Sequence, residues 1–176
     1  MILTGNEIAN QIRSGGIVCE PFEHEHVNPN SLDLTLGNRL LRYTREPLDP
    51  RAEAEVEELE IPRSGVTLPG LTFRLGCSHE IIGSNHFVPI VHGKSSTARA
   101  GLFVHVTADL IDIGSVGRIT FQLFATMPIT VYPGMRIGQV TFWKPHGAID
   151  LYGGKYKGST GPMKSLSFRD KFWGTL

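Results

Sequence analysis

The sequence has little cysteine, no excess charge of either sign and no long hydrophobic run. Its two cysteines, Cys19 and Cys77, stand too far apart for a CxxC motif, so we expect reduced thiols and a cytoplasmic protein. Lysine plus arginine and aspartate plus glutamate both number 17, which excludes a strong overall field toward nucleic acid or an anionic membrane. The start of the chain lacks an apolar signal core, and no run approaches the roughly 18 apolar residues of a membrane span. Any anion must therefore be bound by a local cluster of residues.

The length of 176 residues suits one domain with a substantial core, and we predict a single domain over residues 1–176. A short helix is predicted at its start. Thr4 is a suitable N-cap with Glu7 three residues later, and an apolar stripe follows until Gly15.

The rest of the chain has the pattern of short strands. Residues 31–43 alternate leucines with Asp33 and Thr35, which is typical of a half-buried strand. Further short β-like runs follow up to residue 143, separated by Pro-Gly turns. The pattern predicts a mostly β fold, either a distorted barrel or a jelly-roll-like sandwich, with one short N-terminal helix.

Two segments do not fit the strand pattern. Residues 44–65 concentrate acidic residues and prolines, and we interpret them as a solvated excursion, with an acidic partner-binding site as the alternative. The end of the chain is rich in glycine and lysine but carries more aromatic residues than disordered segments usually have: Tyr152, Tyr156, Phe168, Phe172 and Trp173. We predict that residues 153–176 form a lid over a ligand.

The stretch GKSSTAR, ending at Arg99, combines groups that bind phosphate. Gly93 permits a tight turn, Ser95 and Ser96 can donate hydrogen bonds, and Lys94 and Arg99 supply positive charge. The stretch lacks the spacing of a Walker A loop. The alternative is a solvated turn that enters a helix with a serine as its N-cap.

Seven histidines raise the possibility of a metal site. His24 and His26 alternate along what reads as an extended stretch, but the HxE and PCxxC motifs of zinc nucleoside deaminases are absent, so we expect no protein-held zinc. We expect His105 to pack in a strand with both ring nitrogens hydrogen-bonded to neighbours.

Four blocks in register resemble the dCTP deaminase family, which shares its fold superfamily with trimeric dUTP diphosphatases. The blocks are GKSSTARAGLFVHVTADLID, GRITFQL, PGMRIGQVTF and YGGKYKGSTGP, and the likeness extends to NPNSLDLTLGN and the N-terminal helix. The resemblance therefore covers nearly the whole chain. It implies a dUTPase-type fold, a homotrimer with active sites shared between subunits, and a pyrimidine deoxynucleoside triphosphate as substrate, with Mg²⁺ carried on the triphosphate.

The resemblance also assigns site residues. It implies that the loop holds the triphosphate, that Asp112 binds the sugar 3′-hydroxyl and can order an attacking water, and that backbone near Thr107 and Ala108 reads the pyrimidine. The lid would close over a neighbour's ligand. The implied substrate-binding residues are Lys94, Ser95, Ser96, Arg99, Thr107, Ala108, Asp112, Gln122, Gln139, Tyr152, Lys155 and Ser159, and the implied catalytic residues are Ser95, Arg99, Asp112 and Gln122.

The sequence departs from the family pattern near the expected base. Gln122 stands where the family has its catalytic glutamate, and a carboxamide can hold a water but cannot take its proton. Ser159 replaces a lid glutamine, Asp109 and Leu110 match neither the deaminase-only nor the bifunctional pattern, and Ile113 replaces a proline.

Three explanations of Gln122 stay open: an introduced substitution that traps a substrate complex, a natural relative with other hydrolytic chemistry, and a non-catalytic nucleotide binder. The main prediction is a dCTP deaminase-like hydrolase that converts dCTP and water to dUTP and ammonia. The alternatives are a dUTP diphosphatase or related triphosphate hydrolase, and a regulatory nucleotide-binding protein.

Overall fold

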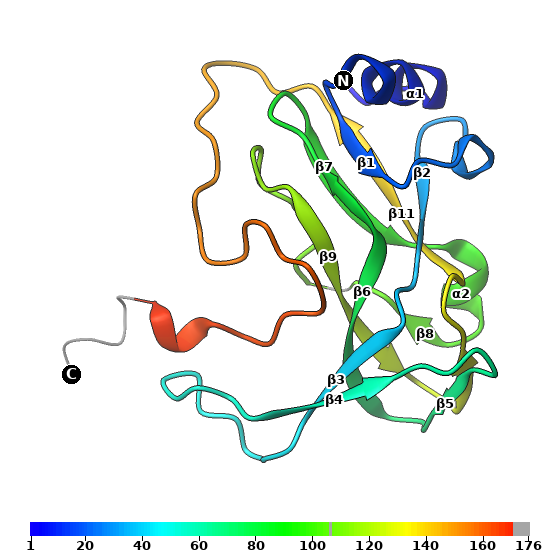
Figure 1. Ribbon diagram of the computed structural model, residues 1–176, viewed down its shortest axis with the longest axis vertical. Coiled ribbons are helices and arrows are strands. Elements are labelled where there is room, and N and C mark those ends of the chain that lie inside the picture. The colour runs from blue at the N-terminus through cyan, green and yellow to red at the C-terminus, as the bar shows by residue number, and fades with distance from the viewer. Residues whose placement is uncertain (106, 171–176) are drawn as a thin grey trace.

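The computed structural model describes residues 1–105 and 107–170 (Figure 1). These residues contain three β-sheets, two α-helices and two 3₁₀ turns. The helices are α1 (Gly5–Ser14) and α2 (Ser95–Arg99), and the 3₁₀ turns are η1 (His24–His26) and η2 (Ser167–Arg169). The strands are β1 (Val18–Glu20), β2 (Leu32–Thr35), β3 (Arg39–Tyr43), β4 (Val56–Glu60), β5 (Val66–Leu68), β6 (Thr72–Gly83), β7 (Val88–Gly93), β8 (Leu102–Phe103), β9 (Gly117–Ala125), β10 (Ile129–Val131) and β11 (Arg136–Trp143). No helix of this described part is long and apolar enough to cross a bilayer.

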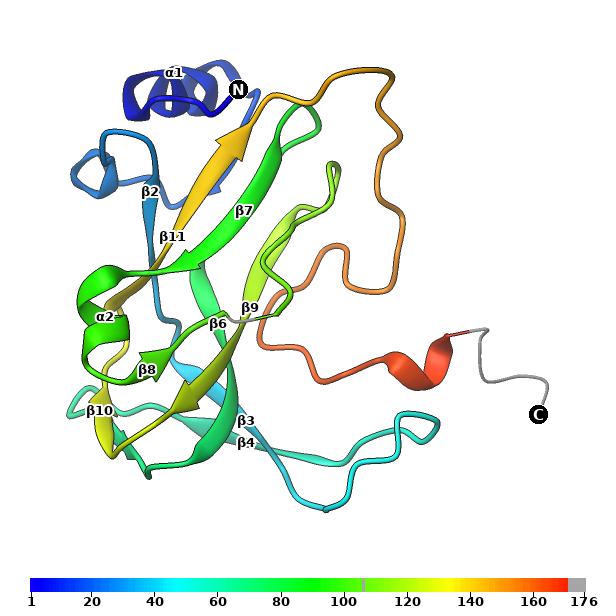
Figure 2. The same ribbon diagram turned by 180° about the vertical axis from the view of Figure 1, so that it is seen from behind.

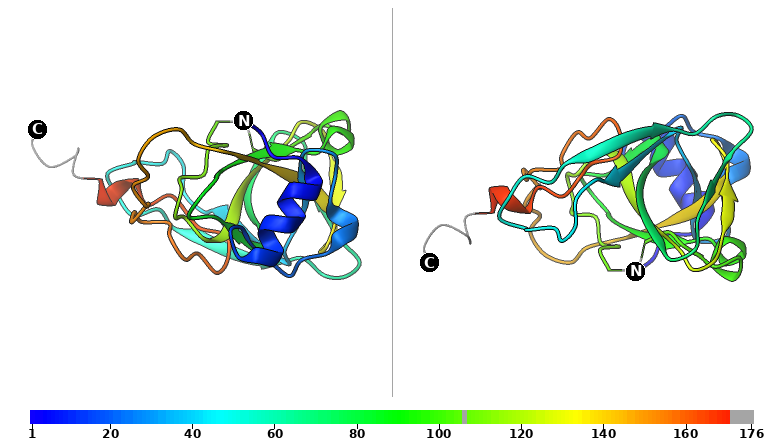
Figure 3. Two further views of the ribbon diagram at one scale, coloured as in Figure 1. Left: turned by 90° about the horizontal axis from the view of Figure 1, so that it is seen from above. Right: turned by 90° about the horizontal axis from the view of Figure 1, so that it is seen from below.

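The predicted N-terminal helix is confirmed, including both of its ends. The Thr4 hydroxyl accepts the backbone N–H of Glu7 at 3.4 Å, and Gly15 ends the helix in the left-handed conformation with φ of 81°. Ile8 is fully buried, and α1 lies across one end of the sheets (Figure 3).

The sheets confirm the mostly β prediction, and they do not close into a barrel. The largest has the order β4-β3-β6-β9-β8, with β1 also pairing with β6. The second has the order β2-β11-β7, and β10 pairs with β5. Fully buried side chains from both larger sheets form one core, among them Leu34, Phe121 and Phe142.

Strand β2 is buried on both faces, so the prediction of a half-buried strand was wrong here. Its polar residues are kept inside by partners. Asp33 accepts hydrogen bonds from Lys94 Nζ at 2.6 Å and Asn28 Nδ2 at 2.8 Å. Thr35 donates its hydroxyl to the buried Glu80 carboxylate at 2.6 Å. Alternating polarity identified the strand, but it could not show that the second face is also covered. Polar residues are buried there only because they have hydrogen-bond partners, and these partners come from other parts of the chain.

The acidic segment 44–65 is more ordered than the predicted solvated excursion. Its strand β4 pairs with β3, and basic residues of β3 face its acidic ones, as in the ion pair between Arg39 and Glu58 at 3.5 Å. Cross-strand pairs of opposite charge stabilise such an exposed hairpin.

The end of the chain folds back over its own sheets (Figure 1). Lys164 Nζ pairs with Glu53 at 2.8 Å and the Ser167 hydroxyl donates to Pro50 O at 2.9 Å, which fastens the tail to the β3–β4 hairpin. Phe172 and Trp173, two of the aromatic residues singled out above, lie outside the described residues.

Candidate active site

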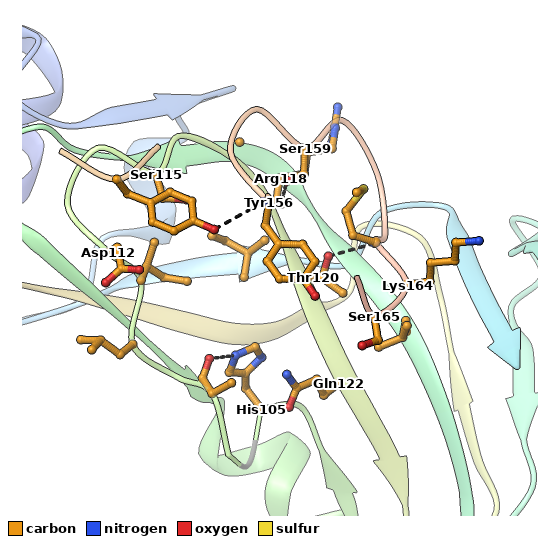
Figure 4. Close-up of a pocket in the computed structure, with 18 of the residues that line it drawn as sticks. His105, Asp112, Ser115, Arg118, Thr120, Gln122, Tyr156, Ser159, Lys164 and Ser165 are labelled. Atoms are coloured by element: carbon orange, nitrogen blue, oxygen red, sulfur yellow. Dashed lines mark hydrogen bonds between the residues drawn. The ribbon is translucent and has the colours of Figure 1, made fainter. Parts of the chain in front are cut away.

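A pocket of about 450 Å³ opens between β9, the turn before it and the folded-back tail (Figure 4). Strand β9 supplies Thr120 and Gln122, the preceding turn supplies Asp112 and Ser115, and the tail supplies Tyr152 and Ser159. Tyr43 and Phe73 stack on one another at 6.4 Å between ring centroids and form an aromatic wall. The pocket thus offers an apolar face beside several polar groups, as small-molecule sites do.

Gln122 faces this pocket because residues alternate sides along β9. Its neighbours Phe121 and Leu123 are fully buried in the core, whereas Gln122 is half-buried. The Thr107 hydroxyl donates to Gln122 Oε1 at 3.5 Å, and the Gln122 backbone N–H donates to Val104 O at 2.9 Å. The structure therefore brings Gln122 and Thr107 together.

His105 lies against the same part of the pocket (Figure 4). Its Nε2 donates to the carbonyl oxygen of Ala108, while its Nδ1 is buried without a hydrogen-bond partner in the described part of the chain. His105 lies after β8 and outside the strands, so the expectation that it packs in a strand with both ring nitrogens hydrogen-bonded was wrong on both points. Burial lowers the pKa of His105, outweighing the hydrogen bond to Ala108 and the charge of Asp109, which raise it. The ring is therefore neutral at neutral pH.

Asp112 is exposed at the rim of the pocket, at the start of a tight turn. Its carbonyl oxygen accepts the Ser115 N–H at 3.0 Å, and Gly114 takes a φ of 88° between them. The turn leaves the Asp112 carboxylate free to contact a ligand in the pocket.

The tail adds Tyr152 and Ser159 to the pocket of the same chain. Tyr152 N donates to Ile113 O at 2.7 Å, which ties the start of the tail to the Asp112 turn. Lys155 does not line the pocket, and its ammonium pairs with Asp170 and stands 5.6 Å from the Tyr156 ring.

The GKSSTAR loop lies elsewhere. Its last five residues form α2, whose N-cap is Lys94 rather than a serine. Ser95, Ser96 and Arg99 are exposed, and none of them lines the pocket. Figure 2 shows α2 at one side of the molecule and the tail at the other.

The remaining predicted residue, Gln139, lies near Lys94 on the β2-β11-β7 sheet. Gln139 pairs in register with Asp33, and its Oε1 accepts the Ser31 hydroxyl at 3.4 Å. Within one chain the predicted residues thus form two groups. The pocket group is Ala108, Asp112, Gln122, Tyr152 and Ser159, with Thr107 hydrogen-bonded to Gln122, the loop group is Lys94, Ser95, Ser96, Arg99 and Gln139, and Lys155 belongs to neither.

Sequence reasoning missed several pocket residues. Arg118 opens the GRITFQL block and lines the pocket, and its guanidinium donates to Ser78 O at 3.1 Å. Its position two residues from Thr120 and four from Gln122 in an alternating strand could have revealed it. Nothing in the sequence links Tyr43 or Phe73 to the pocket, because they come from strands distant along the chain.

His24 and His26 lie in the 3₁₀ turn η1, not in the extended stretch that was predicted. Across residues 1–105 and 107–170, no three His, Cys, Asp or Glu side chains are grouped so that they could hold a metal ion.

Comparisons with known proteins agree with the fold. Residues 2–145 match the family model described as dCTP deaminase-like. Two proteins of Clostridium botulinum, strains Eklund 17B and Alaska E43, both named "dCTP deaminase, dUMP-forming", are 44% and 43% identical to this chain over 97% of its length and 98% of theirs. The crystal structure of 2′-deoxycytidine 5′-triphosphate deaminase from Agrobacterium tumefaciens superposes with a TM-score of 0.66 at 24% identity, covering 82% of this chain and 48% of that one.

Proposed function

The chain belongs to the dCTP deaminase-like family, and from this premise we propose that it hydrolyses dCTP to dUMP, releasing ammonia and pyrophosphate. The names of the similar bacterial proteins favour dUMP as the product over the dUTP expected from the sequence.

One observation carries the proposal: Gln122, Ala108 and Asp112 line a single pocket beside the tail, and Thr107 donates a hydrogen bond to Gln122. In this proposal the pyrimidine lies against Thr107 and Ala108, beside Gln122. Asp112 contacts the sugar 3′-hydroxyl and orders the water that attacks the phosphate chain. Tyr152 and Ser159 close the site as parts of a lid formed by residues 153–176 and the segment just before it.

The triphosphate requires cationic groups that this pocket does not concentrate. Arg118 donates to backbone carbonyls and Lys164 is paired with Glu53. The cationic loop with Ser95, Ser96 and Arg99 lies apart, exposed and ready to bind an anion. We propose that a second copy brings its loop to this pocket, so that the chain works as a homotrimer with shared sites.

Lys94 has a supporting role in this arrangement. Its ammonium is held by the buried Asp33 carboxylate at 2.6 Å, which fixes the start of α2. Arg99 can therefore serve as the main bidentate phosphate ligand. Mg²⁺ would arrive on the triphosphate, as nucleotide substrates commonly carry it.

A second candidate function is dUTP diphosphatase, and Gln122 favours it. Release of pyrophosphate uses the water at Asp112 and needs no proton acceptor at position 122. Deamination, in contrast, needs a group that takes a proton near the pyrimidine ring. The diphosphatase reaction would therefore survive a carboxamide at this position.

The experiment that tests the proposal incubates the protein with dCTP or dUTP and Mg²⁺ and follows ammonia and pyrophosphate separately. We expect both products from dCTP. Pyrophosphate from dUTP with no ammonia from dCTP would establish the diphosphatase instead, and tight binding without either product would identify a regulatory binder.

A further inference from the structure

A buried imidazole nitrogen without a partner is unusual and calls for an explanation. Nearly all buried polar groups are hydrogen-bonded, and one left unpaired destabilises the folded protein. Nδ1 of His105 is such an atom in the described part of the chain, and its ring lines the pocket. The cost is offset most directly if this nitrogen gains a partner when the site is occupied.

The tautomer of His105 follows from its other nitrogen. A carbonyl oxygen only accepts hydrogen bonds, so the contact with Ala108 O places the proton on Nε2. Nδ1 therefore carries a free lone pair. Since burial keeps the ring neutral at neutral pH, this lone pair is available as a base.

The position of His105 relative to Gln122 is fixed by the backbone. The hydrogen bond from Gln122 N to Val104 O holds the residue before His105 against β9. Figure 4 shows the imidazole and the amide of Gln122 in the same part of the pocket. Thr107 occupies Gln122 Oε1, which leaves the amide N–H₂ to hold other groups.

Of the other side chains lining the pocket, few could act as the base. Asp112 is exposed at the rim, and Arg118 and Lys164 are cations. His105 is thus a neutral basic group within the lining of the pocket that holds Gln122.

We propose that His105 is the general base of deamination in this chain, with Nδ1 taking over the proton transfers that a glutamate at position 122 would perform. The inference rests on the proposed function. Gln122 then holds the attacking water through its amide, and His105 moves the protons. Geometry in an unliganded site need not show the final hydrogen bond, since such contacts tighten when substrate binds.

The proton balance closes with two transfers. As the water oxygen bonds to C4 of the cytosine, Nδ1 takes one water proton and passes it to N3. Nδ1 then takes the proton of the new C4 hydroxyl and passes it to the amino group, the C4–N bond breaks, and ammonia leaves. The uracil product keeps the water oxygen as its 4-carbonyl and the first proton on N3.

The test compares His105→Gln with the unaltered protein. A glutamine amide N–H can still donate to Ala108 O but has no basic nitrogen, so the turn is kept and the base is removed. We expect ammonia release from dCTP to fall by about 10² to 10⁴-fold, while pyrophosphate release from dUTP stays near normal. The exposed His86→Gln is the matched control and should leave both activities unchanged.

A second variant separates lost chemistry from lost structure. Adding Gln122→Glu to His105→Gln supplies a carboxylate at the family position and should restore ammonia release. Two results would overturn the role of His105 but leave the proposed deamination standing. One is equal ammonia release by His105→Gln and the unaltered protein, and the other is no recovery of ammonia release in the double variant. If the unaltered protein binds dCTP but releases no ammonia at any pH, the proposed deamination fails as well.

Discussion

Arg118 and Ser159 are joined by reciprocal hydrogen bonds: the Arg118 N–H donates to Ser159 O at 2.8 Å, and the Ser159 hydroxyl donates to Arg118 O. Next to them, Gly158 N donates to Val116 O at 3.0 Å. The tail therefore lies along the start of β9 like a short additional strand. Ser159, one of the departures from the family pattern, therefore both lines the pocket and holds the tail against β9 through hydrogen bonds.

Gly117→Ala should detach the tail from β9. A Cβ at Gly117 would lie 2.7 Å from Ser159 N, a backbone atom that moves only with the tail. We expect faster proteolytic cleavage after Lys157 or Lys164 and weaker nucleotide retention. Gly153→Ala is the control, because its Cβ would meet no atom within 4 Å. Equal cleavage of the two variants would show that the close approach does not hold the tail.

Lys94→Met should lower the free energy of unfolding by about 1 to 3 kcal/mol, since it leaves the buried Asp33 without its nearest cation. Urea unfolding at neutral pH measures this as a lower midpoint. Arg136→Met is the matched control, because Arg136 lies 3.9 Å from the same carboxylate and is half exposed. Adding Asp33→Asn to Lys94→Met should recover part of the loss. If the double variant is as unstable as Lys94→Met, the loss of stability is not caused by the unpaired Asp33 carboxylate.

Much of the fold could be predicted from sequence because local signals specify it. The cap at Thr4, the turn at Gly15 and the strand periodicity all have short-range causes. The second covered face of β2 could not be predicted, since it depends on Lys94 and Glu80, which lie far along the chain.

The same division holds at the site. The family resemblance identified Gln122 and Asp112, which line one pocket, and Thr107, which donates a hydrogen bond to Gln122. It could not show that the loop with Arg99 lies apart from them, because strand order rather than spacing decides where α2 packs. Nor could it show that the Nδ1 of His105 lacks a partner, which is a property of packing.

Cys19 predicts a specific loss of stability at alkaline pH. Burial, with a smaller effect of Glu80, raises the pKa of the Cys19 thiol from 9.0 to about 12. The unfolded chain therefore loses this proton near pH 9 while the folded chain keeps it, so stability is intact below pH 9 and falls as pH rises toward 12. Urea midpoints measured from pH 8 to 10.5 should fall less steeply in Cys19→Ser. Identical slopes would contradict the assignment.

Mixing two inactive variants tests whether the site is shared between copies. Arg99→Ala removes the proposed phosphate ligand and leaves the pocket, whereas Asp112→Asn alters the pocket and leaves the loop. If each site takes the loop from one copy and the pocket from another, mixed trimers regain sites that contain both intact halves. With random mixing, about a quarter of all sites contain both intact halves, so pyrophosphate release should return to roughly a quarter of the unaltered rate. The subunits are unfolded and refolded together to exchange them, and each variant refolded alone provides the baseline. A mixture no more active than the two baselines, with exchange verified by mass, would mean that each chain builds its own site, and the exposed loop at α2 would then need another role.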